Sequence, residues 1–190
     1  MIYIDQQVDQ FDLHAALATV SEQRLCHALR YKKEHDQRLS VAAYRLLQHA
    51  LRVEHGIDEP PTFAFGHHGK PLLIGHPNIF FSLSHCHDAA ACAVDTVPIG
   101  IDVESLSSYD PEIVTAVMSD EELHQITDSL DPCLTFLRLW TMKESLLKMT
   151  GEGITTDMRR ILDRTAIQDH SIRFQTTVYP LFVCTVCWGR

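Results

Sequence analysis

The sequence contains no long hydrophobic run and no basic N-terminal segment. None of its apolar stretches approaches the roughly 18 residues that a bilayer-spanning helix needs. The chain begins with "MIYIDQQVDQF", which carries acidic residues where a signal peptide carries basic ones. We therefore expect a cytoplasmic protein that makes no contact with a membrane.

Positive charge is scarce as well. Only 16 Lys and Arg stand against 25 Asp and Glu, which gives a formal net charge of -9. Nucleic-acid binding requires a basic surface, so nucleic acid is excluded as a partner. The charges are unevenly placed: residues 102–131 hold nine acids and no Lys or Arg, whereas residues 21–55 hold seven Lys or Arg and four acids. The first segment could hold a metal ion and the second could bind an anion, or both could be ordinary solvated surface.

The six cysteines do not indicate a disulfide scaffold, because such scaffolds belong to short secreted domains. "CTVC" at residues 184–187 has the spacing of a zinc or redox motif, but it lies in the strand-like run "PLFVCTVCW". Positions three apart on a strand face opposite ways, and no second cysteine pair completes a zinc site. We therefore predict reduced cysteines in the core.

Hydrophobic periodicity predicts helices alternating with groups of strands. Residues 21–33 and 36–55 read as helices, the second ending at Gly56. Three short apolar runs then predict an antiparallel meander: "IFFSLS" at 79–84, "AAACAV" at 89–94 and "IGIDVE" at 99–104. Helices follow after Asp110, after Ser119 with a capping box to Glu122, and over 132–150. The last strands are "SIRFQTTV" at 171–178 and "LFVCTVCW" at 181–188. This order predicts an α+β fold of two similarly built lobes that meet near residue 98.

Two pairs of charged residues stand out within these elements, Asp102 with Glu104 and Glu144 with Lys148. In "IGIDVE" the aliphatic residues face one way, whereas Asp102 and Glu104 face the other. In the 132–150 helix, Glu144 and Lys148 share a face that continues the apolar stripe of Leu137 and Trp140. Taken alone, Glu144 and Lys148 could form an ordinary surface ion pair worth about 0.3 to 0.5 kcal/mol.

Five motifs occur in order along the chain: "GKP" at 69–71, "FSLSH" at 81–85, "IGIDVE" at 99–104, "WTMKESLLK" at 140–148 and "GEG" at 151–153. Over most of the chain this series resembles the 4'-phosphopantetheinyl transferases, specifically their larger single-chain class. The resemblance implies two similar α+β lobes, residues 1–97 and 98–190, in a pseudo-twofold arrangement, with antiparallel strands packed against helices.

The resemblance also implies the chemistry. These enzymes transfer the phosphopantetheine arm of coenzyme A to a serine of an apo acyl, peptidyl or polyketide carrier protein, and release adenosine 3',5'-bisphosphate. Their metal is Mg²⁺, which suits carboxylate and phosphate oxygens; the matching metal-site residues are Asp102, Glu104 and Glu144. Glu144 also matches the proposed general base, and Lys148 matches the residue that stabilises phosphate charge. The positions that match the coenzyme A site are Lys70 and His85 for the 3'-phosphate, Ser84 beside them, and Arg24 and Arg38 in the basic segment.

Two points stay open at the level of sequence. Glu122 falls near an acidic position of the family, but its place in a capping box explains it equally well. After Ser84 and His85 the family has small residues that include a Gly, whereas this chain has Cys86, His87 and Asp88, so the path of the loop is open. A His/Cys metal cluster in "SHCHD" is disfavoured because adjacent side chains diverge.

Two other functions would use similar residues. A metal-dependent hydrolase of a nucleotide pyrophosphate needs the same acids but no surface for a protein acceptor. A non-catalytic relative that only binds carrier proteins needs no acids, and the intact set of Asp102, Glu104, Glu144 and Lys148 argues against it. Because one chain holds both lobes, we expect a monomer.

Overall fold

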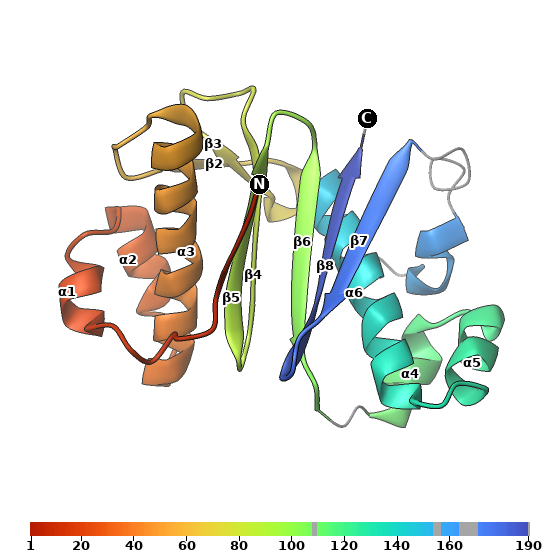
Figure 1. Cartoon of the computed structure of the whole chain (residues 1–190). Coiled ribbons are helices and arrows are strands. Elements are labelled where there is room, and N and C mark those ends of the chain that lie inside the picture. The colour runs from red at the N-terminus through yellow and green to blue at the C-terminus, as the bar shows by residue number, and fades with distance from the viewer. Residues whose placement is uncertain (108–109, 154–156, 164–170, 190) are drawn as a thin grey trace.

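Two three-stranded antiparallel sheets form the centre of the structure, and each carries a long helix on its outer side (Figure 1). The computed structural model describes residues 1–107, 110–153, 157–163 and 171–189. Figure 1 shows the layers in the order α3, first sheet, second sheet, α6. This arrangement of helices on antiparallel sheets confirms the α+β class that the sequence predicts.

The first half of the chain builds the sheet with strand order β1-β5-β4 and a separate hairpin, β2-β3. Its elements are β1 (Ile2–Asp5), α1 (Leu13–Leu17), α2 (Glu22–Ala28), α3 (Glu34–His55), β2 (Phe63–Phe65), the 3-10 turn η1 (His67–Gly69), β3 (Pro71–Leu73), β4 (Phe80–Cys86) and β5 (Ala89–Asp95). Helix α3 packs Leu47, Ala50 and Leu51 against this sheet. It ends where predicted, at Gly56, whose φ of 67° suits a left-handed cap.

Helix α2 is shorter than the predicted helix 21–33. It ends at Ala28, and the chain then turns before α3 starts at Glu34. Arg30, Lys32 and Lys33 in this turn are all exposed. They provide no apolar side chains to continue a buried stripe, so packing does not extend the helix beyond Ala28.

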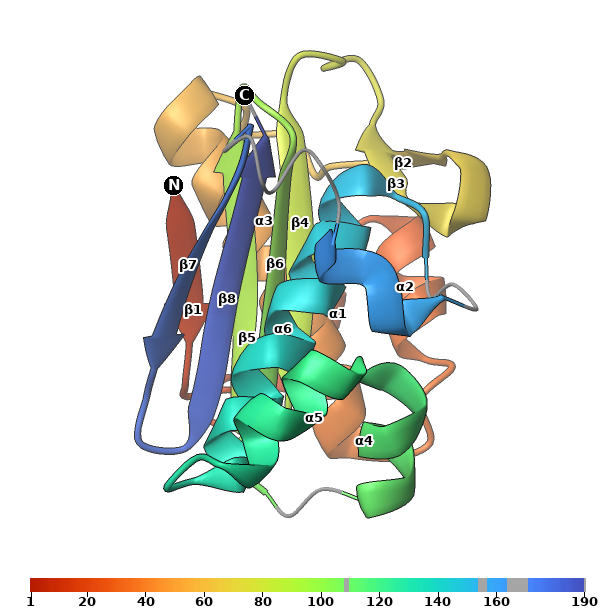
Figure 2. The ribbon, with the colours of Figure 1, turned by 90° about the vertical axis from the view of Figure 1, so that its right-hand side faces the viewer.

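The second half of the chain builds the sheet with strand order β6-β8-β7. Its elements are β6 (Ile99–Ser105), α4 (Pro111–Val117), α5 (Asp120–Thr127), α6 (Pro132–Thr150), the 3-10 segment η2 (Met158–Asp163), β7 (Ile172–Val178) and β8 (Phe182–Gly189). The predicted caps Asp110, Ser119 and Asp131 each accept a backbone hydrogen bond at the start of their helix. Figure 2 shows α4 and α5 beside one end of α6.

The predicted three-stranded meander is wrong in its third strand. Strands β4 and β5 pair as expected, but β6 pairs with β8, from Ile99 opposite Trp188 onward. Where β6 passes β4, the hydroxyls of Ser82 and Ser84 accept the backbone N–H groups of Ile101 and Val103 at 3.0 and 3.3 Å. Serine side chains thus replace a carbonyl ladder, and the two sheets meet without merging.

The core between the two sheets is built from small and branched side chains. Ala89, Ala91 and Ala93 of β5 pack with the aliphatic face of β6 and with residues of β8 that include Cys184. Cys187 packs on the other side, in a cluster with residues of α6. The opposite orientation of these two buried, free cysteines confirms their prediction as core residues.

The helices in the described ranges differ from membrane-spanning helices. None of them has both the length and the apolar character that a membrane span requires.

Candidate active site

Asp102 and Glu104 lie on the side of β6 that faces α6. The aliphatic residues of the opposite face lie in the core between the sheets, as predicted. Asp102 is only 3% exposed. Its Oδ1 accepts hydrogen bonds from Ser84 Oγ at 2.9 Å and from Lys148 Nζ at 2.6 Å. Its Oδ2 is buried and has no hydrogen-bond partner among the described residues.

Gly100 explains how these acids come so close to the helix. A Cβ atom at this position would lie 1.9 Å from the backbone oxygen of Ser145 and 2.6 Å from the backbone nitrogen of Met149, both in α6. No larger residue fits between strand and helix without moving the backbone. The glycine therefore sets the spacing that places Asp102 within reach of Lys148.

We expect Gly100→Ala to lower the free energy of unfolding by about 3 kcal/mol, because the added methyl group overpacks a backbone contact. Urea unfolding measures this loss. Gly189→Ala on β8 is the matched control, because a Cβ there would only touch the end of the Met149 side chain at 3.8 Å. Equal stability of the two variants would contradict the tight strand-to-helix contact.

Lys148 connects α6 to both sheets. Its Nζ donates to Asp102 Oδ1 on β6 and, at 2.8 Å, to Ser84 Oγ on β4. A salt bridge thus joins Lys148 to Asp102. The side chain of Lys148 is 30% exposed. The ammonium is therefore engaged across the junction of the two sheets. The alternative of an ordinary Glu144–Lys148 pair on the helix surface is wrong.

Glu104 is held by the tryptophan of the "WTMKES" motif. Trp140 Nε1 donates a hydrogen bond to Glu104 Oε1 at 3.1 Å. Burial, followed by the negative charge of Asp102, raises the pKa of Glu104 to about 6, although the Trp140 hydrogen bond opposes the shift. Trp140 thus fixes the orientation of Glu104. The positive charge near this carboxylate does not offset the effects of burial and of Asp102 on its pKa.

Glu144 lies one helical turn before Lys148. Its Oε1 is buried and has no hydrogen-bond partner among the described residues. Burial and then the charge of Asp102 raise the pKa of Glu144, whereas Lys148 lowers it. Two unpaired oxygens, Asp102 Oδ2 and Glu144 Oε1, therefore belong to mutually repelling carboxylates.

This excess of buried negative charge fits a hard cation. Among the residues that the structure describes, no three His, Cys, Asp or Glu side chains form a ready-made metal cage. Mg²⁺ does not need one, because it commonly takes one or two carboxylates and completes its octahedron with phosphate oxygens and water. Asp102, Glu104 and Glu144 have the donor atoms for such a site.

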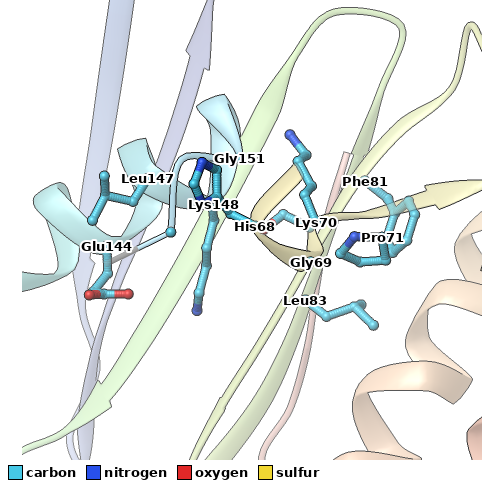
Figure 3. Close-up of a pocket in the computed structure, with 12 residues that line it drawn as sticks. His68, Gly69, Lys70, Pro71, Phe81, Leu83, Glu144, Leu147, Lys148 and Gly151 are labelled. Atoms are coloured by element: carbon cyan, nitrogen blue, oxygen red, sulfur yellow. The ribbon is translucent and has the colours of Figure 1, made fainter. Parts of the chain in front are cut away.

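A pocket of about 240 Å³ adjoins these residues. Glu144 and Lys148 line it from α6, and Phe81 and Leu83 line it from β4 (Figure 3). Lys70 lines it from the hairpin side, but its Nζ donates to the carbonyl of Met149, near the end of α6. The pocket thus combines apolar walls with two ammonium groups, which suits an organic group that carries phosphates.

His85 and Arg24 lie together in a second basic group. The Tyr31 ring contacts the His85 ring edge-on, with centroids 6.3 Å apart. Arg24 donates to Ser40 Oγ at 3.1 Å and lies over the Tyr44 ring. Burial lowers the pKa of His85 most, and the charges of Lys148 and Arg24 lower it further. Arg24 and Lys148 therefore supply the positive charge beside His85, whose lowered pKa favours the neutral imidazole, and this charge would favour a bound anion.

Arg38 lies apart from this basic group. Its guanidinium pairs with Glu34 at 2.7 Å, donates to the carbonyl of Phe11 and lies over the Phe11 ring. Its positive charge is thus already balanced by a neighbouring acid. The structure brings Asp102, Ser84 and Lys148 into contact, but it does not bring Arg38 to them.

The loop after His85 is placed by two histidines. The imidazoles of His35 and His87 lie 4.6 Å apart, and His35 also contacts Asp9 and the His87 carbonyl. Cys86 is 9% exposed and belongs to the core between the sheets. Within the described ranges, the side chains of "SHCHD" form no group of three or more His, Cys, Asp or Glu that could hold a metal ion.

A buried ion pair beside the site escaped sequence reasoning. Lys143 is fully buried, and its Nζ donates to Glu122 Oε2 at 2.6 Å and to the carbonyls of Val117 and Met158. Glu122 also forms the predicted capping box with Ser119. Its carboxylate is thus engaged with α5 and Lys143, and these contacts give Glu122 a structural role. In the sequence, the burial of Lys143 could have been predicted from Leu139 and Leu147, which lie four residues before and after it and so share its face of the helix.

We expect Glu122→Ala to cost about 3 to 5 kcal/mol of stability, because it leaves the Lys143 ammonium buried without a counter-ion. Chemical denaturation measures this loss. Glu121→Ala is the control, because Glu121 is the adjacent residue in the chain and its side chain is exposed. Adding Lys143→Met to Glu122→Ala should restore part of the loss, and a double variant that is less stable still would contradict the pairing.

Comparison with known proteins gives one consistent result. The sequence model of the 4'-phosphopantetheinyl transferase superfamily matches residues 98–187. A 4'-phosphopantetheinyl transferase of Bacillus subtilis is 28% identical over 189 residues, which cover 97% of this chain and 84% of the relative. Another enzyme of Bacillus subtilis, 4'-phosphopantetheinyl transferase Sfp, is 26% identical over 81% of this chain and 70% of the relative.

A relative from Nostoc extends the comparison. The 4'-phosphopantetheinyl transferase HetI of Nostoc is 32% identical over 162 residues, which cover 80% of this chain and 68% of the relative. The matched superfamily region contains β6 and α6, the two elements that bring Asp102, Glu104, Glu144 and Lys148 together. The chain therefore belongs to the 4'-phosphopantetheinyl transferase superfamily.

Proposed function

We propose that this protein transfers the 4'-phosphopantetheine arm of coenzyme A to a serine of an apo carrier protein, with release of adenosine 3',5'-bisphosphate. The observation that carries the proposal is the meeting of Asp102, Glu144 and Lys148 beside a pocket with apolar walls. Family membership supports the same reaction. The acceptor and its pathway are proposed only as a class: an acyl, peptidyl or polyketide carrier.

The proposal includes two lobes, residues 1–97 and 98–190, in a pseudo-twofold arrangement. In support, each half holds a three-stranded antiparallel sheet with one long helix, α3 or α6, on its outer side. The residues that line the pocket come from both halves. One chain thus supplies both walls of the site, and we propose that it acts as a monomer in the cytoplasm.

Mg²⁺ is the proposed cofactor, with Asp102, Glu104 and Glu144 as its protein ligands. When bound, it neutralises charge on the pyrophosphate of coenzyme A and on the phosphoryl group in transfer. The two unpaired, buried carboxylate oxygens of Asp102 and Glu144 support this assignment. Trp140 orients Glu104 through its indole N–H.

Glu144 and Lys148 have the catalytic roles in this proposal. The serine hydroxyl attacks phosphorus, the bond to the leaving phosphate oxygen breaks, and Glu144 takes the serine proton. The raised pKa of Glu144 suits this role, because a base with a pKa nearer neutrality accepts a proton more readily. Lys148 donates from α6 toward the negative charge that builds up on the phosphate oxygens.

Coenzyme A is proposed to lie along the basic side of the site. The pocket beside Glu144 would receive its apolar and ring portions between Phe81, Leu83 and Lys70. Ser84, His85 and Arg24 would bind phosphate oxygens. Arg38, which lies apart from them, would reach a phosphate only by leaving Glu34. Carrier proteins of this type are usually acidic, so the exposed Arg30, Lys32 and Lys33 suit an approach from this side.

One experiment separates the proposed reaction from its alternatives. The protein is incubated with coenzyme A, Mg²⁺ and several apo carriers, and each carrier is weighed by mass spectrometry. The transferase adds the mass of one phosphopantetheine arm. Release of nucleotide without a modified carrier would instead show pyrophosphate hydrolysis, and carrier binding with neither product would show a binding-only protein.

We expect His85→Ala to weaken coenzyme A but barely affect dephospho-coenzyme A, which lacks the 3'-phosphate. Loss of a hydrogen bond to a charged group costs about 1.5 to 3 kcal/mol, or at least about tenfold in affinity. Lys70→Ala should behave in the same way. Isothermal titration with both ligands tests each residue, and equal losses on both would show that it acts elsewhere.

A further inference from the structure

We propose that Lys148 occupies the cation position at Asp102 in the ligand-free protein, so that Mg²⁺ binds weakly alone and cooperatively with coenzyme A. This inference rests on the proposed function of the site. It concerns what the side chain of Lys148 does before substrate arrives. Its starting point is the salt bridge between Lys148 and Asp102, in which the two atoms lie 2.6 Å apart.

The ammonium of Lys148 already does what a metal ion would do at Asp102. It balances the charge of a carboxylate that is 3% exposed, and it contacts Oδ1, the oxygen that Ser84 also holds. The other oxygen, Oδ2, stays unpaired. Because Asp102 is so buried, a metal ion at this carboxylate would lie close to the Lys148 ammonium, and the two cations would repel each other strongly.

Lys148 is also free to leave. Its side chain is 30% exposed, and a lysine ammonium at the end of four methylene groups can move while its backbone stays in α6. Within the described structure its only hydrogen-bond partners are Asp102 and Ser84. If the ammonium leaves Asp102, it gives up its one ion pair. An incoming phosphate provides the replacement.

This exchange couples the two ligands. Mg²⁺ alone must displace Lys148 from Asp102, so its apparent affinity is the intrinsic affinity multiplied by the fraction of molecules in which Asp102 is free of Lys148. Coenzyme A phosphates accept Lys148 and release the carboxylate. By linkage, Mg²⁺ raises the affinity for coenzyme A by the same factor that coenzyme A raises the affinity for Mg²⁺. Neither ligand is then held firmly without the other.

The test is to measure Mg²⁺ binding to the ligand-free protein by calorimetry, or Mn²⁺ binding by electron paramagnetic resonance. We expect Lys148→Met to bind the metal about tenfold more tightly than the wild type, although it loses transferase activity. The estimate is the affinity equivalent of one charged hydrogen bond. Lys148→Arg, which keeps the charge, should not show this gain.

Lys70→Met is the matched control. It removes an ammonium from the same pocket, but Lys70 donates to a backbone carbonyl and not to Asp102. Its metal affinity should stay within about twofold of the wild type, because a screened charge at longer range contributes little. A gain equal to that of Lys148→Met would show a general charge effect and overturn the exchange. Far-UV circular dichroism confirms that each variant is folded.

Repeating the titrations with saturating coenzyme A completes the test. The wild type should gain metal affinity on adding coenzyme A by a factor about tenfold larger than Lys148→Met does. Equal gains, or a Lys148→Met variant that binds metal no more tightly than the wild type, would overturn this inference and leave the proposed transferase intact. If neither the wild type nor any variant binds metal, with or without coenzyme A, the proposed metal site is refuted. The proposed exchange of Lys148 is then refuted with it.

Discussion

The Asp102→Asn variant is expected to lose about 10³-fold in transferase activity, since several kcal/mol of charge stabilisation depend on the metal ligands. Asn keeps the shape of the side chain and one oxygen, but it removes the charge that pairs with Lys148 at 2.6 Å. The loss should appear in the maximal rate of carrier modification, followed by mass spectrometry at saturating coenzyme A. A high Mg²⁺ concentration should restore part of the activity, because weaker metal binding is offset by mass action.

Asp120→Asn provides the matched control. Asp120 lies in the same acid-rich segment, in the first turn of α5, and its side chain is exposed. Its replacement changes the net charge by the same amount and should leave activity unchanged. If the two variants lost activity equally, general acidity of the segment would matter and not the position of Asp102. Normal activity of Asp102→Asn would refute the metal assignment.

The sequence predicts the local structure of this site well. Alternation in "IGIDVE" placed the aliphatic side chains in the core and the acids on the other face of β6. The helix caps at Asp110, Ser119 and Asp131 were readable because each satisfies orphan N–H groups within its own first turn. These features depend on neighbours in the chain, and so a pattern of a few residues determines them.

Features that depend on residues far apart in the chain could not be predicted from the sequence in the same way. The pairing of β6 with β8 joins residues more than 70 positions apart, and it is favoured because Ser82 and Ser84 satisfy the N–H groups of β6 from the other side. Lys148 finds its partner across the sheet junction and not along its own helix. Serine and lysine patterns occur widely on surfaces, so only the assembled fold distinguishes these positions.

Two ion pairs on α6 show how neighbouring lysines serve different purposes. Lys143 is fully buried, and its three acceptors come from α4, α5 and η2, so it fixes the packing of these elements around the helix. Lys148 is partly exposed and has one acidic partner. A cation with several fixed partners stabilises structure, whereas one with a single partner at a pocket can exchange it for a ligand. Glu144 lies between them and has an unpaired oxygen.

Glu144→Gln is expected to lower the maximal rate by about 10²-fold or more, the range for loss of a general base. Gln keeps the shape of the side chain and one oxygen that can contact a metal, but it cannot accept the serine proton. Coenzyme A affinity should fall much less than the rate. The measurement is carrier modification across a Mg²⁺ titration, with coenzyme A affinity determined separately by calorimetry.

The Mg²⁺ titration distinguishes the two roles proposed for Glu144. If Glu144 is chiefly a metal ligand, a high Mg²⁺ concentration should recover much of the activity of Glu144→Gln, because weaker binding is offset by mass action. If it is the base, the rate should reach a low plateau that more Mg²⁺ does not raise. Near wild-type activity at ordinary Mg²⁺ would rule out both roles, and the proton would then have to leave through another group beside the pocket.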